Sequence, residues 1–207
     1  MPATPRRLSI FPLAQAIMFP RSHLPLHIFE PRYRALISDT MARDRRIGMI
    51  QPRGAGDPPP LFDIGCIGRV ADIQAMEDGR FNIVLEGVSR FRVVRELDVT
   101  TPFRQVEALA MTEEQDDPGI LSSSERAALE AEAHVFADHL GYGVDWDAVG
   151  RLDDETFVNA IAQVGPFDIA SKQALLEVDR LTERSEMLVQ LMQFHGRGDA
   201  QGRGTMQ

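Results

Sequence analysis

The feature that most constrains the fold is a change of pattern close to Thr112. Before it, apolar and polar residues tend to alternate, as in residues 81–86, which is typical of half-buried β-strands. After it, apolar residues recur at helical spacing, and polar residues that can cap a helix precede the runs. The acidic, proline-containing stretch 113–119 is typical of a linker. The sequence therefore predicts an α+β protein, with a strand-rich domain over residues 1–112 and a helical bundle over residues 113–195.

Charge is distributed as unevenly as the pattern. Residues 1–110 carry 15 basic and 12 acidic side chains, whereas residues 111–207 carry 7 basic and 19 acidic ones. Such an asymmetry indicates two units with different surfaces. Residues 196–207 are polar and rich in glycine, and we expect them to form a disordered tail.

The first domain is predicted to be a small mixed barrel with one early helix. The expected strands cover residues 9–11, 16–19, 47–51, 64–76, 81–86, 89–97 and 103–111, and the helix covers residues 31–43. Residues 77–80 have the composition of a tight hairpin turn. Gly65 and Gly68 indicate a bulge or bend, and Gly87 is expected to break the pattern between two strands.

The second domain is predicted to hold four helices. The first follows a capping box at Ser122 and Glu125 and ends at Gly141. Asp153 is expected to cap a second helix that ends at residue 164, and Asp168 a third over residues 170–178. Asp179 is expected to cap a fourth helix over residues 181–194.

Residues 24–34, Leu-Pro-Leu-His-Ile-Phe-Glu-Pro-Arg-Tyr-Arg, form the corner between strand and helix in the first domain. The stretch begins as an apolar extended segment, and the switch to helix falls at Glu30. Pro31 suits the first helical position, where a missing N–H costs nothing.

No catalytic constellation is present in the sequence. It lacks the phosphate-binding motif G-x-x-x-x-G-K-[ST], and its single lysine, Lys172, is adjacent to Ser171, so the two side chains point ~100° apart on a helix. The single cysteine, Cys66, is expected to be a small buried residue. We therefore expect a protein without enzymatic activity.

The histidines do not form a metal site by spacing. Pro25 prevents a helix between His23 and His27, and in a strand they would lie ~13 Å apart. His134 and His139 lie roughly 140° apart around a helix. Hydrogen-bonded or solvated structural histidines are the preferred interpretation, and we expect no metal and no cofactor.

No apolar run approaches the ~20 residues that a membrane span needs. The N-terminal apolar stretch superficially imitates a signal peptide, but Pro12 and Gln15 interrupt it. These patterns predict a cytoplasmic protein without a membrane partner.

Several motifs of the first domain occur in an order and spacing that resemble a known family. They are Phe-Pro-Leu at 11–13, Met-Phe-Pro at 18–20, the stretch 24–34, Gly-Met at 48–49, Gly-Cys-Ile-Gly-Arg at 65–69 and Leu-Glu-Gly-Val-Ser-Arg-Phe-Arg-Val at 85–93. Together they resemble the N-terminal substrate-binding domain of Lon, the ATP-dependent bacterial protease. Residues 167–177 and 179–192 resemble the family more loosely. In this family a glycine commonly follows the Phe-Pro pair, whereas this chain has Arg21.

The resemblance implies a PUA-like pseudo-barrel followed by a helical bundle, and a role in engaging unfolded or damaged polypeptides. Lon continues into an ATPase module and a Ser-Lys peptidase module, which this sequence does not reach. We therefore expect a stand-alone, non-enzymatic form of the domain.

The leading hypothesis is a polypeptide-binding module, such as an adaptor or holdase, whose apolar patch includes Phe29 and Tyr33 as an aromatic anchor. The candidate binding residues are Leu26, Phe29, Glu30, Arg32, Tyr33 and Arg34. The alternative for the apolar members of the stretch is a place in the core, between helix and barrel. Which of the two aromatic residues is exposed stays open at this point.

The second hypothesis is RNA binding, because PUA-like barrels elsewhere bind RNA and Arg90, Arg92 and Arg104 are predicted to point outward. The weak positive charge of the first domain and the acidic second domain make nucleic acid the less favoured partner. A third hypothesis is a structural role in an assembly.

Overall fold

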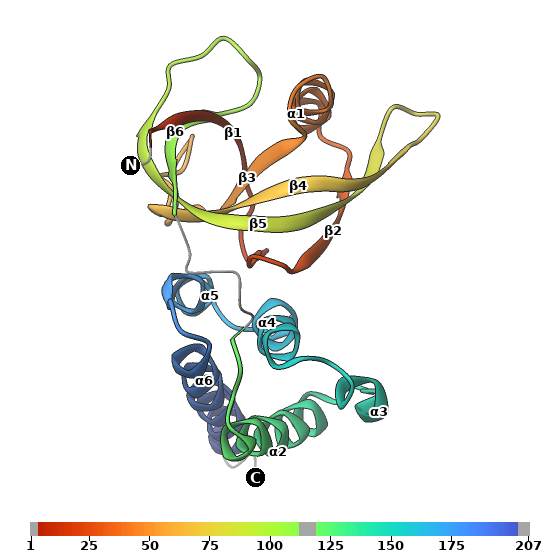
Figure 1. The fold of residues 1–207 in the computed structure, drawn as a ribbon, viewed down its shortest axis with the longest axis vertical. Coiled ribbons are helices and arrows are strands. Elements are labelled where there is room, and N and C mark those ends of the chain that lie inside the picture. The colour runs from red at the N-terminus through yellow and green to blue at the C-terminus, as the bar shows by residue number, and fades with distance from the viewer. Residues whose placement is uncertain (1–3, 112–118, 203–207) are drawn as a thin grey trace. The chain divides into compact units, whose positions relative to one another are not determined.

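The computed structural model describes residues 4–111 and 119–202, with side chains as far as His195. The chain divides into two compact units, residues 1–115 and 116–207. The expected domain boundary, between residues 112 and 113, lies outside the described residues. Strands make up most of the first unit and helices make up the second, so the predicted α+β class is confirmed (Figure 1).

The first unit is built on a six-stranded sheet. Its strands are β1 (Arg6–Pro12), β2 (His23–Ile28), β3 (Arg46–Ile50), β4 (Ile64–Ala75), β5 (Phe81–Glu96) and β6 (Gln105–Ala110). The strand order is β2-β5-β4-β3-β1-β6, and β5 pairs with β6 as well (Figure 1). This second pairing closes β5, β4, β3, β1 and β6 into a ring. Within the described chain, β2 pairs with β5 alone and is therefore an edge strand.

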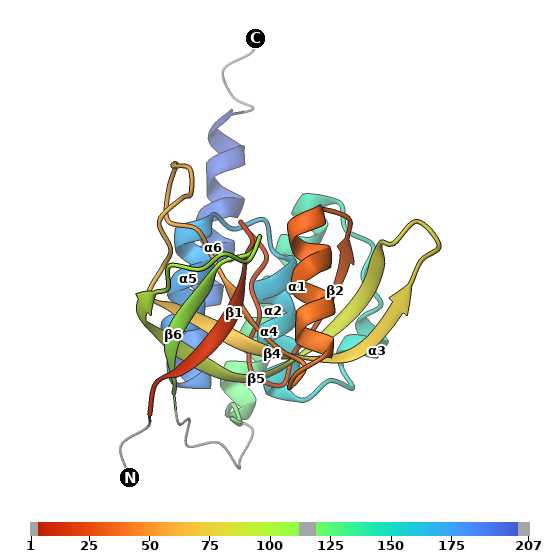
Figure 2. The same ribbon diagram turned by 90° about the horizontal axis from the view of Figure 1, so that it is seen from above.

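The core of the first unit lies inside this ring and beneath one helix. A central cluster of buried side chains comprises Leu8, Ile10, Ile50, Ile67, Phe91, Val106 and Ala108. Helix α1 (Pro31–Met41) runs beside β1 and buries Leu36 and Ile37 completely (Figure 2). Burying such a side chain stabilises the fold by about 1.5–3 kcal/mol. The core thus fixes the two elements between which residues 24–34 turn.

Residues 16–19 do not form the strand that their pattern predicts. The backbone on either side is bent, with Gln15 at φ 65° and Arg21 at φ 61°. The Ser22 hydroxyl accepts a hydrogen bond from the Phe19 N–H (3.0 Å) and donates one to the Phe19 carbonyl (2.8 Å). The Ser22 side chain therefore satisfies the backbone N–H and carbonyl groups of Phe19, with which a neighbouring strand would otherwise pair. Phe19 itself is fully buried, so the segment contributes to the core although it is not a strand.

Strand β5 is continuous where the sequence predicts two strands separated at Gly87. The Gly87 N–H donates to the Ser22 carbonyl, and its own carbonyl accepts from the Arg21 N–H, each at 2.9 Å. A Cβ atom at Gly87 would collide with the Phe19 carbonyl. Glycine is required here by a close backbone approach and not by a break in the strand.

The second unit consists of helices. They are α2 (Ser123–Leu140), α3 (Trp146–Val149), α4 (Asp154–Val164), α5 (Ile169–Glu177) and α6 (Leu181–Gly202). Helix α3 was not predicted, because one turn is too short to show a hydrophobic period. Leu129 of α2 and Leu188 of α6 are fully buried, and α2 packs against α6. Helix α6 passes the expected end at Phe194 and continues into the segment expected to be disordered, since extending a formed helix costs little. Residues 203–207 lie outside the described chain.

The helix caps predicted at Ser122, Asp153 and Asp168 are confirmed. Ser122 and Glu125 form a reciprocal capping box. The carboxylates of Asp153 and Asp168 accept hydrogen bonds from the backbone N–H groups of Thr156 (2.9 Å) and Ser171 (2.6 Å). Across the described part of the chain, no helix is both long and apolar enough to cross a membrane.

Candidate peptide-binding surface

The corner between β2 and α1 forms as the sequence predicts. Glu30 is the N-cap residue, with extended backbone angles of φ −66° and ψ 135°, and Pro31 occupies the first helical turn. The Glu30 side chain makes no capping hydrogen bond and pairs instead with Arg32 at 2.9 Å. Both side chains are substantially exposed, so this ion pair contributes little to stability.

Tyr33 lies in the core at this corner. Its side chain is 6% exposed, its ring centroid lies 4.0 Å from that of Phe11, and its hydroxyl donates to the Pro12 carbonyl at 3.1 Å. Burial raises the pKa of the Tyr33 hydroxyl. Tyr33 therefore fastens the start of α1 to β1 and is not accessible to a polypeptide.

Phe29 has the opposite environment. Its side chain is 60% exposed, although it comes directly after the buried Ile28. The ring stacks against His27 with centroids 6.1 Å apart. The two aromatic residues of residues 24–34 thus separate into one buried anchor and one exposed ring, because Tyr33 packs from α1 against Phe11 whereas Phe29 precedes the helix.

A shallow concavity of about 300 Å³ lies on the outer face of β2, β5 and β4, and its lining includes His27, on which Phe29 stacks. Cross-strand pairing explains its lining. Pro25 lies opposite Val84 and Val84 opposite Asp72, while His27, Asn82 and Gln74 form the next row. Leu26 and Ile83 complete the lining.

Hydrogen bonds order the second of these rows. The His27 Nδ1 atom lies 2.7 Å from the Asn82 Oδ1 atom, and the Asn82 amide donates to Gln74 at 3.3 Å. Their side chains hold one another in place across three strands and present a polar strip beside an aromatic ring. Such a surface can hold an extended chain through both kinds of contact. His27 is the hydrogen-bonded structural histidine that we preferred from its spacing.

Arg34 reaches the hairpin between β4 and β5. A Cβ atom at Gly79 would collide with the Arg34 guanidinium, and Gly79 has a φ of 78°. Next to it, Arg80 pairs with Asp78, whose pKa is lowered mainly by the Arg80 backbone N–H. Of the predicted binding residues, Leu26 lines the concavity, Phe29 stacks on its lining residue His27, and Glu30 and Arg32 pair with each other at the corner. Tyr33 is buried, and Arg34 lies at the hairpin.

His27, Asn82 and Gln74 were not among the predicted binding residues. The alternation of β5 indicates that Asn82 points away from the core, but sequence carries no signal for the register that places it between His27 and Gln74. The row is a product of strand pairing.

The predicted set of outward arginines is partly wrong. Arg90 is 5% exposed, because it lies opposite Cys66 where β4 is buried on both faces over residues 64–68. Arg104 forms a bidentate pair with Glu96 (2.6 and 2.7 Å) and donates to the Pro59 carbonyl. Arg92 is exposed as predicted.

The single cysteine and the single lysine occupy positions that support the fold. Cys66 is fully buried, as predicted. The Lys172 ammonium donates to the Gln163 carbonyl at 2.8 Å, and burial lowers its pKa. Within the described chain, no three His, Cys, Asp or Glu side chains are grouped so that they could hold a metal ion.

Comparison with known proteins places this geometry in context. The family model of the ATP-dependent protease La (LON) substrate-binding domain matches residues 7–193. The chain is 26% identical over 200 residues to Lon protease 2 of Myxococcus xanthus and 24% identical over 199 residues to Lon protease of Azorhizobium caulinodans. These alignments cover 91% and 93% of this chain but 24% and 23% of those proteins. The chain therefore spans about a quarter of the length of these relatives.

Two solved structures share the fold. A Lon N-terminal domain protein from Xanthomonas campestris has a TM-score of 0.64 at 21% identity, covering 89% of this chain and 97% of that one. The N-terminal domain of Lon protease from the Mycobacterium avium complex has a TM-score of 0.66 at 17% identity, covering 92% and 100%. The likeness extends over both units.

Proposed function

Because the chain belongs to the family of the ATP-dependent protease La (LON) substrate-binding domain, we propose that it binds unfolded or damaged polypeptides without catalysing a reaction. The binding surface is the outer face of β2, β5 and β4 next to Phe29. The observation that carries this proposal is the 60% exposure of a phenylalanine beside a concavity on an edge strand.

An extended polypeptide suits this surface for two physical reasons. Main-chain groups can add to an edge strand whatever the sequence of the added segment. An apolar side chain of that segment gains burial against Phe29 and Leu26. Pro25 removes one N–H donor from β2, which limits uncontrolled edge-to-edge pairing between copies.

Titration with fluorescently labelled, denatured casein tests the proposal. Phe29→Ala should weaken binding about tenfold, as expected when a central aromatic contact is lost. Val94→Ala is the matched control, because Val94 is also an exposed apolar residue of the first unit (48%) but belongs to the part of β5 that pairs with β6 and not with β2. Equal binding by the parent chain and Phe29→Ala would reject this surface.

A holdase role requires, in addition, that the protein prevents aggregation of other proteins. The protein should suppress light scattering from a heat-denatured test protein at stoichiometric ratios and without ATP, and Phe29→Ala should reduce the suppression. Casein binding without suppression would favour an adaptor role, in which the bound chain is passed to another protein.

A second candidate function is RNA binding, and one observation favours it. A cavity of about 420 Å³ in the first unit is lined by Arg6, Arg7 and Arg46, with Asp44 beside them. Phosphate contacts make binding fall steeply with salt. Labelled RNA whose affinity drops at least tenfold between 50 and 200 mM salt, and further in Arg46→Gln, would support this function. Casein binding that persists at high salt would count against it as the main activity.

A further inference from the structure

The helical unit contains an apolar pocket that the surface near Phe29 does not involve. Its volume is about 140 Å³, and its walls come from α2, α3, α4 and α6. Among the lining side chains are Phe136, Trp146, Phe157, Ile161, Val164 and Met192. The walls are almost entirely apolar, whereas the surrounding helices are rich in charge.

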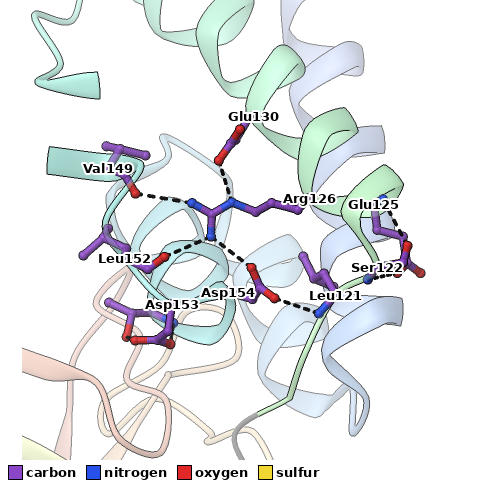
Figure 3. A network of polar contacts seen from close by, with 10 residues as sticks. Leu121, Ser122, Glu125, Arg126, Glu130, Val149, Leu152, Asp153 and Asp154 are labelled. Atoms are coloured by element: carbon purple, nitrogen blue, oxygen red, sulfur yellow. Dashed lines mark hydrogen bonds and ion pairs between the residues drawn. The ribbon is translucent and has the colours of Figure 1, made fainter. Parts of the chain in front are cut away.

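The pocket is preformed, because Arg126 ties its walls together. The Arg126 guanidinium reaches from α2 to the carbonyls of Val149 (3.3 Å) and Leu152 (3.1 Å) and to the carboxylate of Asp154 (3.0 Å), as Figure 3 shows. It also lies 4.4 Å from the centre of the Phe157 ring, which lines the pocket. These bonds fix α3 and the start of α4 relative to α2. A ligand therefore does not have to order the walls.

The size of the pocket selects one large apolar side chain. A cavity of about 150 Å³ lined by apolar side chains accommodates benzene. Val164 and Tyr142 on the rim are 70% and 49% exposed, so the pocket is reached from solvent. Trp146 is held in position by stacking on His134 at 3.5 Å.

The charge around the pocket selects what accompanies that side chain. Between Gly119 and His195 the sequence has 14 Asp and Glu residues against 5 Lys and Arg residues. Three of the five, Arg126, Lys172 and Arg184, donate to internal carbonyl groups. Acidic residues flank the pocket in sequence, with Asp138 next to Ala137 and with Asp145 and Asp147 on either side of Trp146. The helical unit therefore carries a net negative charge, which attracts a positively charged ligand.

We propose that this pocket binds one aromatic or large aliphatic side chain of a basic polypeptide segment, in which Lys or Arg residues flank the apolar anchor. The site belongs to the second unit, so it goes beyond the function proposed for the surface near Phe29 and does not depend on it.

Fluorescence anisotropy with three short labelled peptides tests the ligand chemistry. The first peptide has one phenylalanine flanked by lysines, the second has serine in place of phenylalanine, and the third has glutamates in place of lysines. We expect the second and third peptides to bind at least tenfold more weakly than the first. Equal binding of the first two would show that charge alone is recognised and would overturn the proposal.

Two matched variants test the location. Val164→Lys and Val135→Lys each add one positive charge at an exposed valine of the second unit (70% and 64% exposed), but only Val164 lines the pocket. We expect Val164→Lys to weaken binding of the lysine-flanked peptide at least fivefold and Val135→Lys less than twofold. Equal weakening would overturn the proposal. Because both sites are exposed, both variants should melt close to the parent temperature in circular dichroism.

Further measurements separate this site from the other possibilities. Phe29→Ala should leave binding of the lysine-flanked peptide unchanged; loss in Phe29→Ala with none in Val164→Lys would reject the pocket while the function proposed for the first unit stands. Sedimentation velocity should show the same oligomeric state for the parent chain and Val164→Lys. Self-association that disappears in Val164→Lys would mean that a second copy occupies the pocket and would overturn the proposal.

Discussion

The two units expose apolar surface in opposite shapes. In the first unit, Phe29 is exposed in the short connection between β2 and α1, and in the second, Trp146 and Phe157 line a hollow between helices. Strand β2 ends at Ile28, so Phe29 belongs to the corner before α1, where its ring projects into solvent. Helices are cylinders, and the spaces between them are hollow wherever side chains do not fill them. The same chain therefore has an exposed aromatic ring on one unit and an apolar pocket on the other.

The largest expected effect is a difference in stability between variants of the buried Tyr33 and of the exposed Phe29. Tyr33→Ala should lower the free energy of unfolding by about 4 kcal/mol, because it leaves a cavity beside Phe11 and removes the hydrogen bond to Pro12. Phe29→Ala should cost less than about 0.5 kcal/mol. Urea unfolding followed by circular dichroism measures both. Similar losses in the two variants would mean that Phe29 also supports the fold.

The next largest effect concerns Arg126, whose hydrogen bonds hold the walls of the apolar pocket in the second unit. Arg126→Ala should cost about 3 kcal/mol, because it leaves the Val149 and Leu152 carbonyls and the Asp154 carboxylate without this donor. Trp146 is the single tryptophan, so its fluorescence reports unfolding of the helical unit. The exposed Arg151→Ala is the control and should cost less than about 0.5 kcal/mol. A normal unfolding midpoint in Arg126→Ala would show that the pocket walls do not rely on this network.

A smaller effect tests the start of α4, one wall of the hollow. Asp153→Ala should cost about 1 kcal/mol at pH 7 through loss of the cap, whereas Asp138→Ala near the end of α2 should cost nothing measurable.

The pH dependence of this cap has a definite sign. Hydrogen bonds from the hydroxyl and N–H of Thr156 hold the pKa of Asp153 below its usual 3.8. The cap is therefore complete above about pH 4 and is lost as the pH falls through the lowered pKa. Asp153→Asn should lose less stability than the parent between pH 4 and pH 2, monitored by Trp146 fluorescence. An identical acid profile would indicate that other carboxylates dominate.

The smallest effect concerns the turn that leads into β2, the strand that Phe29 follows. Arg21 has a φ of 61°, a conformation that favours glycine. Arg21→Gly should leave stability within about 0.5 kcal/mol of the parent, because relief of strain offsets the added freedom of the unfolded chain. Arg21→Val should cost about 1 kcal/mol, since a β-branched residue tolerates this conformation poorly. Thermal melts of the two variants distinguish these outcomes.

The sequence by itself determined the features that depend on neighbouring residues. Pro31 at the first helical position set the corner after β2, and Ser122, Asp153 and Asp168 set the starts of three helices. Such signals are readable because a cap or a proline acts on groups within one turn of itself. The family resemblance was equally readable, since its motifs lie in order along the chain.

Tertiary structure decided which side chains are exposed. Phe29 and Tyr33 have the same chemical character and are four residues apart, yet one is exposed and the other is locked against Phe11. Arg90 is buried because its partner strand is covered on both faces, and Gly87 is needed because a distant segment crosses it. The pocket of the helical unit likewise arises from side chains of four helices. Burial depends on what the rest of the chain brings to a position, and no local pattern carries that information.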